Sequence, residues 1–234
     1  MLKTCRWFYV FLVTGVWVSF MGSASAAVKA QGTATTAWNL IASGGPVVIF
    51  LLLTSIAAAA LVIYHFKHVT VEKLTPRDFT ENILFLLEKK EYQKATSLCK
   101  QQDNLVSAVA LKGLSKMSLG KGAVESAVQY EGKSRIERIW QTLTYLGDIA
   151  VVAPMLGLLG TILGMIDAFN FFKAGTIHPG LLTQGLAKAM INTALGLVVA
   201  VPCLIFYSYF RGKISAITSY AETAASEIAQ AIVK

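Results

Sequence analysis

Long apolar stretches alternate with charged segments along this chain of 234 residues. Three of these stretches carry no charged residue, and they cover residues 47–64, 149–166 and 189–210. A helix that crosses a bilayer needs about 20 apolar residues, because its backbone finds no water there and must hydrogen-bond within itself. We therefore expect three transmembrane helices, over residues 45–66, 147–172 and 187–210.

The charged segments have helical periodicity. Apolar residues recur every three or four positions, both between the first two apolar stretches and in the tail of the chain. They are Phe79, Ile83, Leu86, Leu87, Val106, Val109, Ala110 and Leu114, and then Ile214, Ile217, Ala221, Ala224, Ile228 and Ile232. Such stripes predict helices that pack on one another. We expect a helical segment at 67–146, a C-terminal helix at 211–234, and an all-α membrane protein as the fold class.

The first residues are typical of an export signal. Two cations precede an apolar stretch at residues 7–20, which is short for a membrane span, and small residues at 24–26 resemble a cleavage site. We expect a signal peptide at residues 1–26, followed by a periplasmic segment at residues 27–44.

The distribution of cations orients the spans. Most of the 21 Lys and Arg residues fall within residues 67–146 or after residue 210, and the cytoplasmic flanks of membrane proteins are rich in these residues. We therefore expect both segments in the cytoplasm and a short periplasmic loop at 173–186. The formal charge of +8 follows from this topology, and we expect no nucleic-acid partner.

The composition excludes a typical soluble enzyme. Hydrophobic residues make up 55% of the chain and charged residues 15%, whereas soluble domains carry about a quarter of charged residues. Phosphate-binding, nucleophile-elbow and zinc-protease motifs are absent from the sequence. The three cysteines stand far apart, and His65 and His68 lack a third ligand nearby. We expect no catalytic activity, no cofactor and no metal site.

The second span carries a face of small residues. Gly157, Gly160 and Gly164 share one side of the expected helix, and small residues at this spacing let helices approach closely in lipid. Pro154 lies in the same span and Pro202 in the third, and we expect each proline to kink its helix.

Thr161 and Thr193 are the polar groups of interest in the last two spans. At 1.5 Å per residue, Thr161 lies roughly 12 Å and Thr193 roughly 6 Å from the outer ends of their spans. Each hydroxyl either bonds to a carbonyl of its own helix or faces a shared space, where it can contribute to a proton path.

Asp167 and Lys188 flank the periplasmic loop at similar depth. They either form an ion pair at the outer mouth or remain hydrated, with Lys188 extending its ammonium to the outer surface.

Several runs in these two spans resemble the ExbB/TolQ/MotA family of proton-channel subunits. They are APMLGLLGTILGMI at 153–166, GLA at 185–187, NTALGL at 192–197 and VP at 201–202. The order of the elements, from an outer N-terminus through one span, a long helical segment and two further spans to a helical tail, is similar too.

The resemblance implies an inner-membrane homopentamer around a dimer of a single-span ExbD/TolR-like partner. Protons that pass the partner's membrane Asp would drive rotation and energise outer-membrane transport or envelope processes, with a TonB- or TolA-like energy transducer. In this family the positions that match Thr161 and Thr193 line the pore. One position departs from the pattern, since the family commonly carries Glu where this chain has Lys188.

Two other functions stay open. One is a non-conducting oligomeric membrane scaffold or secretion adaptor. The other is a stand-alone channel or transporter, which predicts inverted repeats or charged groups near the midplane; neither is visible in the sequence.

Overall fold

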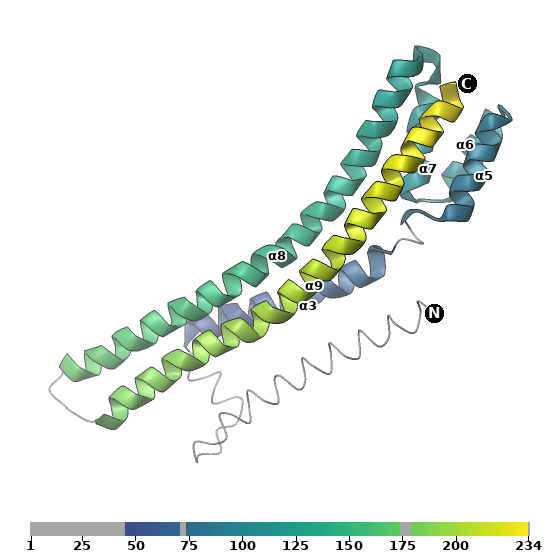
Figure 1. The fold of residues 1–234 in the computed structure, drawn as a ribbon. Coiled ribbons are helices and arrows are strands. Elements are labelled where there is room, and N and C mark those ends of the chain that lie inside the picture. The colour runs from purple at the N-terminus through teal and green to yellow at the C-terminus, as the bar shows by residue number, and fades with distance from the viewer. Residues whose placement is uncertain (1–44, 71–73, 174–178, 234) are drawn as a thin grey trace. The chain divides into compact units, whose positions relative to one another are not determined.

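The computed structural model describes residues 45–70, 74–173 and 179–233, and these form helices joined by short connections. The elements in chain order are α3 (Pro46–His68), α5 (Arg77–Glu88), α6 (Tyr92–Gln101), α7 (Leu105–Ser115), the short 3₁₀ helix η1 (Met117–Leu119), α8 (Lys121–Lys173) and α9 (Pro179–Val233) (Figure 1). No strand occurs among the described residues, so the all-α prediction is confirmed. The expected signal peptide at 1–26, the segment at 27–44 and part of the loop at 173–186 lie outside the described residues.

Within the described part of the chain three helices are long and apolar enough to cross a membrane, namely α3, α8 and α9. The sequence places the first span at 45–66, and α3 extends two residues further. Helices α8 and α9 run on from their apolar parts into polar segments, so residues 146 and 210 are not helix ends. Gly120 has a φ of +90° directly before α8, a backbone conformation that favours glycine. Helix α8 therefore begins directly after Gly120.

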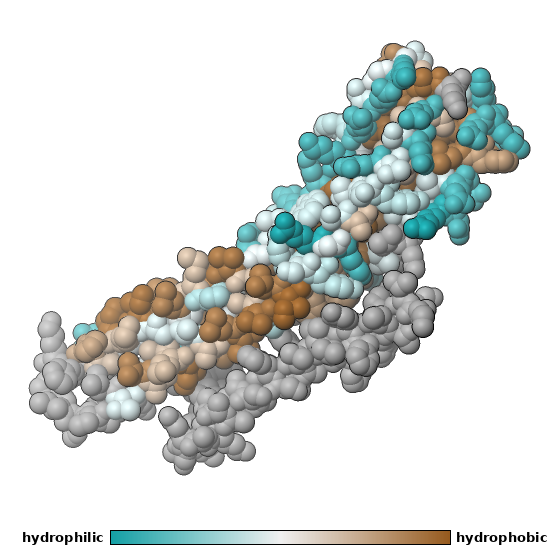
Figure 2. All heavy atoms as spheres, in the orientation of Figure 1, coloured by the Kyte–Doolittle hydropathy of each residue, from teal (hydrophilic) through white to brown (hydrophobic). Residues whose placement is uncertain are grey.

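Contacts divide the chain into two compact units. One, the membrane unit, comprises the described residues up to Ala60 and those within 146–206. The other, the bundle unit, comprises the described residues within 61–145 and 207–233. Figure 2 shows hydrophobic residues gathered on the surface of the membrane unit and hydrophilic residues on that of the bundle unit. Large side chains such as Phe50, Ile56 and Leu158 are exposed, which suits contact with lipid tails.

The bundle unit has an apolar core. The tail stripe that the sequence predicts is buried along its whole length. Its last residues, Ile228 and Ile232, share this core with Phe79, Ile83 and Leu87. Leu86 and Leu114 pack at the edge of the same core. The expectation that the tail packs on its neighbours is therefore confirmed. At Gly113 an added Cβ would lie 2.8 Å from side chains of both α8 and α9, so α7 approaches these two helices closely.

Two local sets of hydrogen bonds and ring contacts hold helices of the bundle unit in place. Helix α7 begins with a capping box, in which Asn104 Oδ1 accepts from the Ser107 amide at 2.7 Å and Ser107 Oγ accepts from the Asn104 amide at 3.1 Å. His65 is fully buried, and its Nδ1 donates to the Leu61 carbonyl at 2.8 Å. The His65 ring also lies 5.2 Å from the ring of Phe210, which ties the end of α3 to α9.

Candidate functional site

A line of small residues on α8 lies against α9 within the membrane unit. A Cβ added to Gly157 would lie 2.9 Å from the Asn192 carbonyl oxygen, and one added to Gly160 would lie 2.7 Å from Asn192 Cβ. At Gly164 the nearest atom would be Ala189 Cβ, at 3.0 Å. Because real Cβ atoms essentially never come within 3.0 Å of another atom, the two backbones meet only where these side chains are missing. The three glycines that the sequence singles out thus lie on a contact within one chain.

Helix α9 contributes glycines to the same contact, and these were missed in the sequence. A Cβ on Gly196 would lie 2.7 Å from the carbonyl oxygen of Ala153, and one on Gly185 would lie 2.6 Å from Ala168 Cβ. We call Gly157, Gly160, Gly164, Gly185 and Gly196 the glycine seam. The sequence does contain a signal for this second face of the contact. Small or polar residues recur at helical spacing along α9, namely Gly185, Ala189, Asn192, Gly196 and Ala200.

Asn192 is a polar residue that packs against the glycine seam, and the sequence analysis did not select it. Its side chain is 2% exposed and fills the space above Gly160. A polar amide inside a span is costly unless it is satisfied within the protein. The missing side chain at Gly160 leaves the room that the Asn192 amide occupies where α9 packs against α8.

The two threonines have different partners. The Thr193 hydroxyl crosses the seam and donates to the Gly157 carbonyl of α8 at 3.3 Å. The Thr161 hydroxyl donates at 2.6 Å to the Leu158 carbonyl of its own helix. Each hydroxyl oxygen still has lone pairs with which it can accept a further hydrogen bond, so both can meet an acid supplied from outside the chain.

The remaining predicted residues are placed only in part. Asp167 is exposed near the end of α8, and the side chain of Lys188 lies outside the described residues, so their ion pair stays a prediction. Pro154 and Pro202 lie inside α8 and α9, which continue past them. The expected kinks stay predictions as well.

The site offers oxygen atoms but no titrating carboxylate. The apolar parts of α8 and α9, residues 149–166 and 189–210, hold no Asp or Glu. Across the described ranges no group of three or more His, Cys, Asp or Glu residues is placed to hold a metal ion. Hydroxyl and carbonyl groups of this kind can guide a proton or contact an acid, but they do not bind and release protons near neutral pH.

Comparison with known proteins gives concordant matches. Residues 101–223 match the profile of the MotA/TolQ/ExbB proton channel family. The chain is 31% identical over 180 residues to a putative biopolymer transport protein ExbB-like 3 of Synechocystis, covering 72% of this chain and 82% of that protein. It is 25% identical over 198 residues to the Tol-Pal system protein TolQ of Pseudomonas aeruginosa, covering 76% and 84%. A shorter match, 50% identical over 64 residues, covers 26% of this chain and 28% of the biopolymer transport protein exbB1 of Vibrio cholerae.

The family match covers more than half of the chain, and it includes the whole glycine seam and both threonines. The family match agrees with the three helices among the described residues that are long and apolar enough to cross a membrane. The chain belongs to the MotA/TolQ/ExbB proton channel family.

Proposed function

We propose that this chain is the multi-span subunit of an inner-membrane motor that conducts protons together with a single-span ExbD/TolR-like partner. Its relatives carry the names biopolymer transport protein and Tol-Pal system protein, which supports a role in energising outer-membrane transport or envelope processes. The proposed assembly is a homopentamer around a partner dimer, with a TonB- or TolA-like transducer and with the N-terminus in the periplasm.

One observation carries this proposal: two hydroxyls stand in apolar stretches that lack any carboxylate. Thr193 is held across the seam at Gly157, and no Asp or Glu lies within residues 149–166 or 189–210. A conducting site needs a group that takes up and releases protons. In this arrangement a second subunit supplies that group, and the threonine oxygens accept a hydrogen bond from it while it is protonated.

The energy available suits a motor. Moving one elementary charge across 100 mV releases about 2.3 kcal/mol. The free energy that a few protons release per step therefore exceeds the coupling free energies between sites in proteins, which are typically 1–3 kcal/mol. The proposed coupling acts through charge interactions and packing between side chains of the complex, and it needs no covalent step.

The partner is tested by purification from the native membrane. The expected result is a short single-span protein with one intramembrane Asp that copurifies with this chain, and whose Asp→Asn variant stops energised transport without loss of the complex. A chain that purifies alone as an oligomer would instead favour the non-conducting scaffold or secretion adaptor.

The hydroxyls are tested by Thr193→Val and Thr161→Val, which keep the side-chain volume and remove the hydroxyl. Both variants should lower the rate of energised transport at equal expression. Thr54→Val is the matched control, because Thr54 lies in α3 and bonds to the Leu51 carbonyl of its own helix at 2.9 Å. If all three variants keep the wild-type rate, the threonines have no part in conduction.

A further inference from the structure

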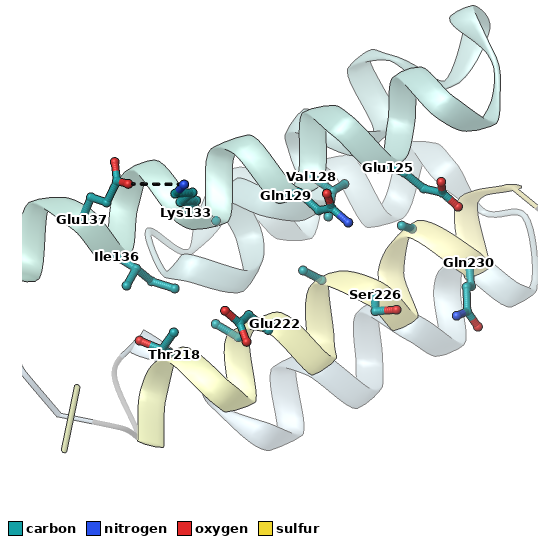
Figure 3. A pocket seen from close by; sticks show the side chains of 14 residues that line it. Glu125, Val128, Gln129, Lys133, Ile136, Glu137, Thr218, Glu222, Ser226 and Gln230 are labelled. Atoms are coloured by element: carbon teal, nitrogen blue, oxygen red, sulfur yellow. Dashed lines mark ion pairs between the residues drawn. The ribbon is translucent and has the colours of Figure 1, made fainter. Parts of the chain in front are cut away.

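A groove of about 890 Å³ runs between α8 and α9 in the bundle unit. Figure 3 shows polar side chains along both of its walls. On α8 they stand four residues apart, which keeps them on one face of the helix, and they are Glu125, Gln129, Lys133 and Glu137. At 1.5 Å per residue this wall is about 18 Å long.

The wall formed by α9 has the same spacing. Its polar residues are Thr218, Glu222, Ser226 and Gln230. Between the two walls the floor consists largely of small residues, such as Gly132, Ala221 and Ala225. A floor of small residues below rows of longer side chains leaves an elongated space, which suits a peptide segment lying along the two helices.

The groove is acidic although the chain as a whole carries a charge of +8. Three carboxylates line it, from Glu125, Glu137 and Glu222, against the single cation Lys133. On the surface of α8, Lys133 Nζ lies 3.9 Å from Glu137 Oε1, and Lys121 Nζ lies 3.9 Å from Glu125 Oε1. Such exposed pairs are weak and exchange partners readily.

Glu222 differs from the other two carboxylates. It forms no ion pair within the described ranges, and it is exposed at the middle of the α9 wall. A cationic side chain lying in the groove would pair with Glu222 and could also reach the weakly paired Glu125 and Glu137. Arg suits this position best, because its guanidinium binds carboxylates through two parallel hydrogen bonds.

We propose that this groove binds the Lys- and Arg-rich cytoplasmic flank of the single-span partner subunit. The inference rests on the proposed function, which supplies such a subunit, and on the charge of the groove. A single-span protein leaves a short flank in the cytoplasm, and positively charged residues concentrate in such flanks. The acidic groove thus anchors the partner outside the membrane.

The test uses the full chain in its native membrane with a photoreactive residue in the groove. Ser226→p-benzoylphenylalanine places the probe on the exposed wall, and Glu227→p-benzoylphenylalanine is the matched control. Glu227 is also exposed and is the next residue of α9, but it does not line the groove and points about 100° away. The expected product is a cross-link from position 226, but not from position 227, to the cytoplasmic flank of the copurifying single-span subunit.

Charge reversal makes the test specific. Glu222→Lys should reduce this cross-link roughly tenfold, since an attraction at the surface becomes a repulsion, whereas Glu227→Lys should leave it unchanged. Reversing the cross-linked Lys or Arg of the partner to Glu should restore it in the Glu222→Lys background.

Two results would overturn the proposal, and they separate it from the proposed function. If the single-span subunit copurifies but position 226 cross-links equally with 227, or only to a second copy of this chain, the groove is not its binding site and the motor function stands. If no single-span subunit copurifies, both proposals fail together.

Discussion

Gly196→Ala tests how tightly α8 and α9 are packed. The added methyl group would lie 2.7 Å from the Ala153 carbonyl oxygen, about 0.7 Å closer than the 3.4 Å at which ordinary contact begins. A backbone oxygen cannot rotate away as a side chain can, so the two helices must separate. Overpacking of this kind costs about 1–3 kcal/mol, while Ala in place of Gly gains up to about 1 kcal/mol within a helix. We expect a net loss of up to about 2 kcal/mol.

Gly212→Ala is the matched control, because Gly212 lies in the same helix and an added Cβ would meet no atom within 4 Å. It should therefore gain about 0.5–1 kcal/mol from helix propensity alone. Thermal unfolding of the purified protein in detergent, followed by circular dichroism, should show a lower melting temperature for Gly196→Ala and an equal or higher one for Gly212→Ala. For a chain of this size each kcal/mol corresponds to about 2–4 °C. Equal rises in both variants would refute the close packing of the seam.

Three further predictions concern other parts of the chain. Asn104→Ala removes the cap of α7 and should destabilise the bundle unit by about 1 kcal/mol, seen as a lower midpoint in thermal unfolding; an unchanged midpoint would show that the cap contributes nothing. Burial raises the pKa of the Cys99 thiol to about 11, so the reactive thiolate is scarce at pH 8. The rate of alkylation at Cys99, followed by mass spectrometry, should therefore increase as the pH rises towards 11, and rapid labelling of the folded protein at pH 8 would contradict this. If Asp167 and Lys188 pair, Asp167→Asn and Lys188→Met should each impair assembly or transport, and the loss in the double variant should be smaller than the sum of the two single losses. Strictly additive losses, or a Lys188→Met variant with no effect, would favour a lysine that extends to the outer surface.

The sequence by itself determined the helical architecture. Charge-free stretches of 18 residues or more have few alternatives to membrane helices, because an unpaired backbone is too costly in lipid. The apolar stripe from Ile214 to Ile232 likewise required a neighbour to cover it, and that stripe is buried in the structure. Both signals depend on the local pattern of apolar and polar residues, which can be read directly from one sequence.

The pairing of side chains across helices was decided only by the tertiary structure. The glycines of α8 indicate a close contact, but their spacing does not say which helix approaches, and only the structure places Asn192 above Gly160 and Ala153 against Gly196. Thr161 and Thr193 look alike in sequence, yet one bonds within its own helix and the other across the seam. The acidic groove likewise combines residues about 90 positions apart along α8 and α9. Such contacts depend on the rotation and register of two helices, which local periodicity leaves undetermined.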